Sequence, residues 1–208
     1  MPTARASLLD AALTALGHRP WVTVRMVDVA AAAGVSRQTL YNEFGSKEGL
    51  ARALVRREAE AFLAGVERAL DAAARHGADA GDCFAAAAAW TLHSARRSPL
   101  VRAVLTGCRG DRVPAAAVVP VPLPRRPGGR PCRDDAPLAP AELLDGFRAR
   151  AVTVLGRRFP GLDRAAADWA CGAAVRVTVS YVLAPAGSDE QACRQVARLV
   201  RGLLRGDC

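Results

Sequence analysis

The residues best suited to chemistry lie in one short segment, which reads VAAAAGVSRQTLYNEFGSKEGL. The amide side chains of Gln38 and Asn42 can each form two hydrogen bonds with the edge of an adenine, and Arg37 can pair with guanine or with a phosphate. Thr39 and Tyr41 suit contacts that fix the register of a nucleic-acid backbone. The alternative for Tyr41 is packing against the helix that follows. For Gln38 and Asn42 the alternative is plain exposure to solvent.

The same segment predicts two short helices joined by a glycine turn. Four consecutive alanines, residues 30–33, allow a close helix crossing, and Gly34 supplies the left-handed residue that ends the first helix. Ser36 is a good N-cap for the second helix, 37–44, which has apolar residues on one face and hydrogen-bonding side chains around the rest. This layout is typical of a helix-turn-helix, whose second helix enters the major groove of DNA.

Two rare residues fall inside this motif. The chain has no isoleucine, one asparagine and one lysine, a bias that indicates a gene of high G+C content. The single asparagine is Asn42, and the single lysine, Lys47, follows a predicted N-cap at Ser46 in the first turn of a long helix. An amide can pair with a base edge and an ammonium group with a phosphate, so this placement supports the motif.

The residues of the motif carry a resemblance to a known family. The segment GVSRQTLYNEFGSKEGL, preceded by VDVAAAA, resembles the N-terminal signature of the tetracycline-repressor (TetR) family of bacterial transcription regulators. The match runs from about residue 27 to residue 54, and the rest of the chain is similar to the family in length and helical character only. The run SRQTLYNEFGSKEGLARAL, with VSYVLAP near the end, is similar to actinobacterial members linked to alkane or fatty-acid metabolism.

This resemblance implies a homodimer with two helix-turn-helix heads, each on a helical body that binds a small effector. The family often has Thr or Ser in the first turn of the preceding helix, whereas Val24 and Arg25 stand here. Arg25 can contact phosphate by its charge, and Thr23 can cap the helix from one position earlier. The predicted DNA-binding residues are Arg25, Ser36, Arg37, Gln38, Thr39, Tyr41, Asn42 and Lys47.

The chain as a whole is predicted to be all-α, with a three-helix head at 1–60 and a larger helical body at 61–208. The segment 109–140 contains eight of the thirteen prolines, so we expect an irregular, arginine-containing loop there. Helices are expected at about 4–16, 37–44, 47–75, 79–97, 99–107, 141–159, 163–183 and 189–204.

The body is predicted to hold a dimer interface and an effector pocket. The last two helices have apolar faces that suit a four-helix interface with a second copy; the alternative is that these faces only close the core of one chain. The predicted interface residues are Trp169, Ala173, Val177, Val196, Leu199, Val200 and Leu203. The predicted pocket residues, each of which alone fits a core position better, are Phe84, Trp90, His93, Leu105, Phe147, Val152, Trp169 and Tyr181. Such a pocket suits a lipophilic effector, a long-chain lipid first of all, and does not suit a multiply charged one.

The net charge and the cysteines limit which partners, metals and redox roles we expect. The net charge of +9 suits a polyanionic partner, but residues 1–60 carry only +2, so the motif and not the charge predicts DNA binding. Six scattered cysteines and three histidines form no zinc-like cluster, and we expect neither a metal nor a cofactor. Reduced thiols in a cytosolic protein are the main interpretation, and a thiol sensor through Cys83, Cys108 or Cys171 is the alternative.

The sequence therefore predicts a DNA-binding regulator rather than an enzyme. It has no Ser/His/Asp order and no Gly-rich phosphate loop. The N-terminal segment MPTARASLLDAAL lacks the long apolar run of a signal peptide, and no run approaches the ~20 apolar residues of a membrane span, so we expect a cytoplasmic protein. The predicted function is a repressor that leaves a palindromic operator when a small lipophilic effector binds. The alternative is an architectural or nucleoid-associated DNA-binding protein of the same fold, which binds many sites and ignores small molecules.

Overall fold

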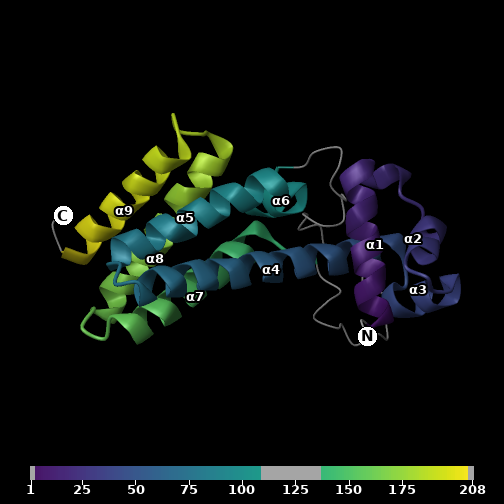
Figure 1. Cartoon of the computed structure of the whole chain (residues 1–208), viewed down its shortest axis with the longest axis horizontal. Coiled ribbons are helices and arrows are strands. Elements are labelled where there is room, and N and C mark those ends of the chain that lie inside the picture. Colours follow the sequence, from purple (N-terminus) through teal and green to yellow (C-terminus); the bar gives the residue numbers. More distant parts are fainter. Residues whose placement is uncertain (1–2, 109–136, 206–208) are drawn as a thin grey trace. The chain divides into compact units, whose positions relative to one another are not determined.

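A computed structural model describes residues 3–108 and 137–205 (Figure 1). Every regular element within these two ranges is a helix, which confirms the all-α prediction. The chain forms two compact units. We call the unit Met1–Glu58 with Gly107–Ala139 the head, and the unit Ala59–Thr106 with Pro140–Cys208 the body. Most of the predicted proline-rich loop, residues 109–136, lies outside the described residues.

The head is a small helical unit in which α1, α2 and α3 pack on one another. Thr3 caps the first helix, because its side chain accepts a hydrogen bond from the backbone N–H of Ala6 at 3.2 Å. Arg57 ties the following long helix to the first through an ion pair with Asp10 at 2.7 Å. The elements are α1 (Ala4–His18), a 3₁₀ turn η1 (Trp21–Thr23), α2 (Met26–Ala32), α3 (Arg37–Phe44) and the start of α4 (Lys47–Arg75). Their core is built from Leu8, Leu16, Trp21, Val29, Leu40, Phe44, Leu50 and Leu54.

The body is a helical bundle built on the second part of α4. Its last helix packs on two others of the bundle, against α5 and α8. The contact with α5 is close, since a Cβ atom added at Gly81 would lie 2.8 Å from the carbonyl oxygen of Ala197. The elements are α5 (Ala80–Arg97), α6 (Pro99–Thr106), α7 (Pro140–Arg158), α8 (Arg164–Leu183) and α9 (Asp189–Arg205).

Aromatic side chains fix α4 against its neighbours in the body. Phe62 of α4 meets Phe147 of α7 edge to face, with ring centroids 6.1 Å apart. Trp90 of α5 lies against Gly65, where an added Cβ would be 2.1 Å from the indole ring. The indole Nε1 donates a hydrogen bond to the backbone carbonyl of Phe62 at 3.0 Å. Helix α4 is therefore held by packing and by a hydrogen bond that satisfies a half-buried indole.

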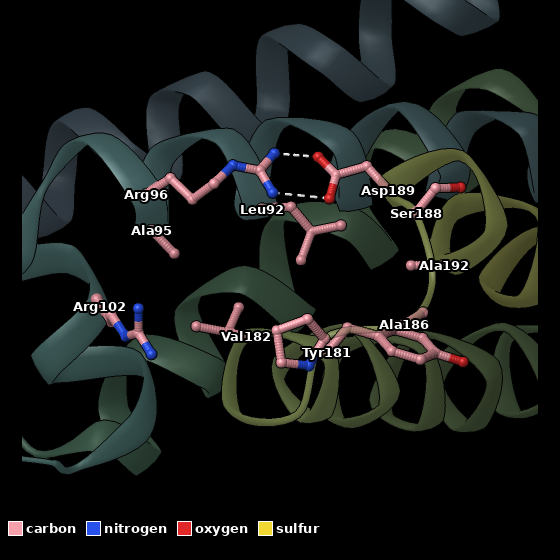
Figure 2. A pocket seen from close by; sticks show the side chains of 11 residues that line it. Leu92, Ala95, Arg96, Arg102, Tyr181, Val182, Ala186, Ser188, Asp189 and Ala192 are labelled. Carbon is pink, nitrogen blue, oxygen red and sulfur yellow. Dashed lines mark hydrogen bonds and ion pairs between the residues drawn. The ribbon is translucent and has the colours of Figure 1, made fainter.

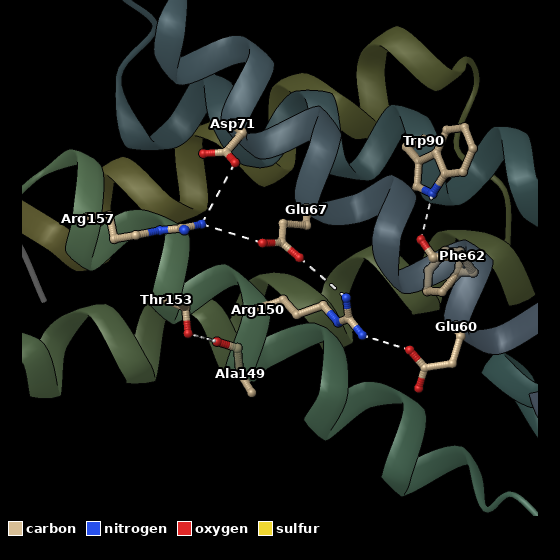
Figure 3. A network of polar contacts seen from close by, with 9 residues as sticks. All are labelled: Glu60, Phe62, Glu67, Asp71, Trp90, Ala149, Arg150, Thr153 and Arg157. Atoms are coloured by element: carbon tan, nitrogen blue, oxygen red, sulfur yellow. Dashed lines mark hydrogen bonds and ion pairs between the residues drawn. The ribbon is translucent and has the colours of Figure 1, made fainter.

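A ladder of ion pairs joins the outer sides of α4 and α7 (Figure 3). Arg150 bridges two α4 carboxylates, Glu60 at 2.8 Å and Glu67 at 3.3 Å. Further along α7, Arg157 pairs with Glu67 at 3.5 Å and Arg158 pairs with Asp71 at 3.3 Å. All these side chains are partly exposed, so each pair contributes modestly to stability. Within residues 3–108 and 137–205, none of the helices has an apolar stretch that could cross a lipid bilayer.

Candidate functional site

Local sequence signals hold α3 in place at the head. Gly34 has a φ of 67°, which allows the turn after α2. The Ser36 side chain then accepts a hydrogen bond from the backbone N–H of Thr39 at 3.0 Å, which makes it the predicted N-cap. Leu40 and Phe44 anchor the helix in the core, with 1% and 9% of their surfaces exposed. The chain leaves the helix at Gly45, whose φ is 68°.

The opposite face of α3 presents hydrogen-bonding groups to solvent. Arg37, Gln38 and Asn42 are exposed, as is Tyr41 with 40% of its surface accessible, while Thr39 is half-buried. Gln38 Nε2 donates a hydrogen bond to Asn42 Oδ1 at 2.8 Å, which aligns the two amides one turn apart. Amides held in one orientation lose less entropy when they bind a base edge. The face can therefore read DNA by direct hydrogen bonding.

Arg5 holds the end of α3, a role that the sequence analysis did not foresee. Its guanidinium lies over the Phe44 ring, 4.8 Å from the centroid, and Nη1 donates to the carbonyl of Glu43 at 3.3 Å. A cation at this point also interacts favourably with the negative end of the helix dipole. The signal in the sequence is faint, because Arg5 and Phe44 are far apart in the chain and no motif links them.

The start of α2 differs from one expectation. Thr23 does not cap this helix, since its hydroxyl donates to the carbonyl of Pro20 at 2.8 Å and closes the η1 turn instead. Arg25 occupies the N-cap position without a side-chain cap and its side chain is 76% exposed. Asp28 pairs with Arg19 at 3.0 Å and with Arg25 at 3.4 Å. Burial alone would raise the pKa of Asp28, but the hydrogen bonds from the two arginines hold it below its ordinary value.

Lys47, at the start of α4, reaches back to the η1 turn. Its Nζ donates a hydrogen bond to the carbonyl of Val22 at 3.1 Å and lies 5.5 Å from the centre of the Trp21 ring. Trp21 is buried, as a core residue of the head should be, while Val22 is 78% exposed. An ammonium group has three donors, so Lys47 keeps donors for a phosphate while its position is fixed.

The body contains a pocket of about 210 Å³ between α5, α6, α8 and α9 (Figure 2). One wall carries an ion pair in which both terminal guanidinium nitrogens of Arg96 donate to Asp189, Nη1 at a distance of 2.7 Å from Oδ1. Arg102 of α6 lines another side of the pocket. The remaining lining residues are Leu92, Ala95, Tyr181, Val182, Pro185, Ala186, Ser188 and Ala192.

Of the residues predicted to line an effector pocket, only Tyr181 lies in this one. Phe84, Leu105 and Phe147 are core residues with at most 2% of their surfaces exposed. Trp90 contacts α4, Val152 is half-buried on α7, and His93 is exposed on α5. Trp169 lies at the surface of α8, 67% exposed. The charged residues of the pocket, Arg96, Arg102 and Asp189, were missed because they come from segments distant in sequence.

The predicted dimer residues divide into two groups. Val196 and Val200 are completely buried within the chain, so they close its core, the alternative that the sequence left open. On α8, Trp169, Ala173 and Val177 follow one another at intervals of four residues and therefore share one face. Trp169 is exposed, and Ala173 and Val177 are half-buried, as are Leu199 and Leu203 on α9.

The cysteines that the sequence singled out differ in burial, since Cys83 and Cys171 are buried and Cys108 is exposed. Burial, together with the charges of Asp79 and Asp82, raises the pKa of the Cys83 thiol to about 11. Burial and the nearby Asp168 raise the pKa of Cys171 to about 12. The thiolate is the reactive form, so both thiols are poor sensors at neutral pH. Cys108 is exposed, while residues 132 and 208 lie outside the described residues.

Comparisons with known families match both parts of the chain. Residues 8–54 match the family model described as bacterial regulatory proteins, tetR family. Residues 138–201 match the model described as bacterial tetracyclin repressor, C-terminal domain. The first match contains the whole of α2 and α3.

Individual proteins agree with these family matches. The HTH-type transcriptional regulator AlkX of Mycobacterium tuberculosis is 33% identical over 202 residues, which cover 94% of this chain and 82% of that protein. The crystal structure of the TetR family repressor AlkX from Dietzia sp. strain DQ12-45-1b has a TM-score of 0.62 at 22% identity, covering 98% of this chain and 96% of that one. FadR from Bacillus subtilis, in complex with stearoyl-CoA, has a TM-score of 0.51 at 15% identity, covering 96% and 97%.

Proposed function

Because the chain belongs to the TetR family of bacterial regulatory proteins, we propose that it is a repressor that binds a palindromic operator as a homodimer and leaves it when a small lipophilic effector binds. Regulators of this family bind operators, form dimers and respond to small molecules. The curated relatives are named as regulators, so the proposal assigns no catalytic role. A regulator of chromosomal genes acts on DNA, and we propose a cytoplasmic location for it.

The outward face of α3 is the observation that carries this proposal. Its guanidinium and amide groups are exposed, while the opposite face of the same short helix is anchored in the core. In our proposal Gln38 and Asn42 read adenine edges, and Arg37 pairs with guanine or phosphate. Arg25, Ser36, Thr39, Tyr41 and Lys47 fix the register on the backbone. Affinity then comes mainly from phosphate contacts and sequence choice from the amides.

The homodimer of the proposal uses the exposed stripe of α8. Trp169 is a large apolar side chain at the surface, and aromatic residues are frequent anchors of protein interfaces. Ala173 and Val177 extend the same face, and Leu199 and Leu203 of α9 add half-buried apolar surface. A two-fold dimer would set its recognition helices about 34–36 Å apart, or a multiple of this, so the operator would be a near-palindrome.

Two structurally similar proteins support the proposal of a lipophilic effector. The Dietzia repressor is implicated in biodegradation of n-alkanes, and the Bacillus subtilis protein was solved with stearoyl-CoA. Binding of such a molecule to the body would lower operator affinity if the DNA-bound conformation binds it less well. Helix α4 is the physical connection, since this one helix contributes to both the head and the body.

Sequencing of the genomic DNA fragments that the purified protein retains at physiological salt tests the proposal. A repressor retains a handful of palindromic sites, one of them beside its own gene, and the neighbouring genes indicate the effector. Recovery of fragments without regard to sequence would contradict the proposal and favour the architectural alternative. Release of the retained sites by lipophilic extracts of the cells, added in a second step, tests the response to a ligand.

A further inference from the structure

We propose that the pocket between α5, α6, α8 and α9 binds a small carboxylic acid with an apolar body, such as a short-chain fatty acid or a single-ring aromatic acid. The carboxylate pairs with Arg102, and the apolar body lies against Leu92 and Val182. This inference rests on the proposed ligand-responsive function and names the class of its effector.

The polar side chains that line the pocket are engaged with other described residues, with one exception. Arg96 and Asp189 neutralise each other across one wall. The Tyr181 hydroxyl donates to Gln195, and the Ser188 hydroxyl accepts the backbone N–H of Gln191 at 3.1 Å. Arg102 lines the same pocket, yet its guanidinium forms neither an ion pair nor a hydrogen bond with the described residues. It is thus the group that offers unused donors to a ligand.

The charged side chains that line the pocket favour a ligand with a single negative charge. Two arginines and one aspartate line the pocket, which leaves one excess positive charge. A guanidinium pairs with a carboxylate through two parallel hydrogen bonds, a geometry that favours planar acids. A cation would meet repulsion from Arg102, and a doubly charged anion would find no second free partner. The charge balance therefore agrees with the expectation that a multiply charged effector is not favoured.

Size and lining set the apolar part of the ligand. About 210 Å³ lies below the ~300–1,000 Å³ of pockets that hold drug-sized ligands. Leu92, Val182 and Ala192 are buried and supply apolar walls, and Pro185 adds an apolar surface at the rim. Figure 2 shows Leu92 and Val182 among these walls, with Arg102 and the Arg96–Asp189 pair at different sides of the pocket. A short chain or one ring fits this space better than a long-chain lipid.

The pocket has a direct mechanical link to α4. Leu92 and Ala95 line it from α5, and Trp90 of the same helix contacts α4 through Gly65 and the carbonyl of Phe62. A ligand that shifts the part of α5 around Leu92 and Ala95 would therefore act on α4, which contributes residues to both the body and the head.

Calorimetric titration of the purified full-length protein tests the inference with four probes: hexanoate, phenylacetate, and their uncharged counterparts hexanamide and phenylacetamide. We expect the two acids to bind at least tenfold more tightly than the amides. The substitution Arg102→Gln should remove this preference, whereas Arg102→Lys should keep part of it. Arg97→Gln is the matched control, since Arg97 is an exposed arginine of α5 that does not line the pocket. It should bind the acids like the wild type.

Three outcomes would overturn the inference: equal binding of acids and amides, the same loss in Arg97→Gln as in Arg102→Gln, or no binding of either acid at millimolar concentration. The same protein samples are tested for retention of specific genomic fragments. If the protein retains specific genomic fragments but binds no acid, the inference about the pocket fails and the proposed function as a DNA-binding regulator is unaffected. If retention is indifferent to sequence, the proposed function itself fails, whatever the titrations give.

Discussion

Two helical surfaces of this protein use their charged and polar side chains in opposite ways. On α3 of the head, Arg37 has no ion-pair partner among the described residues, and the side-chain amides of Gln38 and Asn42 bond to each other. On the outer sides of α4 and α7 in the body, Arg150 and Arg157 are both matched with carboxylates of α4 (Figure 3). Most of the net positive charge lies beyond residue 60, yet the face that we propose to read DNA lies on α3 of the head.

The amount of charge in a region therefore does not locate a binding surface. In the ladder, ion pairs engage Arg150 and Arg157 with carboxylates of the same chain, whereas Arg37 on α3 has no such partner among the described residues and keeps its donors available. The +2 charge of residues 1–60 is therefore compatible with the DNA-binding role proposed for α3.

The substitution Phe147→Ala should lower the free energy of unfolding of the body by about 3–5 kcal/mol, because it removes a fully buried ring and its contact with Phe62. Denaturant unfolding measures the loss. Phe159→Ala, at a half-buried position just after α7, is the control and should cost clearly less. Equal losses in the two variants would mean that the Phe62–Phe147 contact is not central to the core.

The substitution Lys47→Met should weaken DNA binding by a similar factor on every sequence, because the proposed phosphate contact carries no base information. The plot of log affinity against log salt concentration should become shallower by roughly 0.9, the value for one phosphate. Lys47→Arg should keep the slope. Arg68→Gln, an exposed arginine on the body part of α4, is the matched control. An unchanged slope in Lys47→Met would remove Lys47 from the DNA interface.

The substitution Glu67→Gln should lower the free energy of unfolding by only about 0.2–1 kcal/mol, although it removes the negative charge that pairs with both Arg150 and Arg157. The loss should shrink further in high salt, since partly exposed pairs are screened. Glu190→Gln on α9, whose side chain is 85% exposed, is the control and should change stability less. A loss above ~2 kcal/mol that salt does not reduce would show that the ladder dominates the stability of the body.

Acid should weaken the contact between α5 and α9. Hydrogen bonds from Arg201 hold the pKa of Asp79 below its ordinary value. The stabilisation by this carboxylate is therefore complete above the unfolded pKa of ~3.9 and is lost as pH falls through the lower folded pKa. Unfolding followed from pH 6 to pH 2 should show a flatter acid slope for Asp79→Asn. Asp145→Asn, which removes an exposed carboxylate of α7, should leave the slope unchanged.

Local features of the fold were predictable because they depend on neighbouring residues. Gly34 and the N-caps at Ser36 and Ser46 follow from backbone preferences within a few residues, and the structure confirms all three. The spacing of Leu40 and Phe44 identified the buried face of α3 in the same way. The prediction that failed concerns Thr23. Its hydroxyl donates to the carbonyl of Pro20 within the η1 turn and therefore does not cap α2.

Contacts between distant segments were not predictable from one sequence. The pocket joins Arg96 of α5 to Asp189 of α9, 93 residues apart, and no periodic pattern connects them. Hydrophobic spacing also cannot distinguish a core residue such as Phe147 from a pocket wall, because both are apolar positions on one helix face. Val196 and Val200 illustrate the same limit, since an apolar stripe suits a core and an interface equally.

The most direct test of the central claim is a double-mutant cycle on the amides of α3, measured on one retained genomic site and on a scrambled copy of it at the same salt concentration. We predict that Asn42→Ala and Gln38→Ala each reduce affinity for the site by about 1–3 kcal/mol, hardly change affinity for the scrambled copy, and combine non-additively because the two amides are bonded. Arg194→Gln, on the exposed side of α9, should leave both affinities unchanged. Equal losses on the two DNAs, or no loss on either, would contradict the claim that α3 reads the operator.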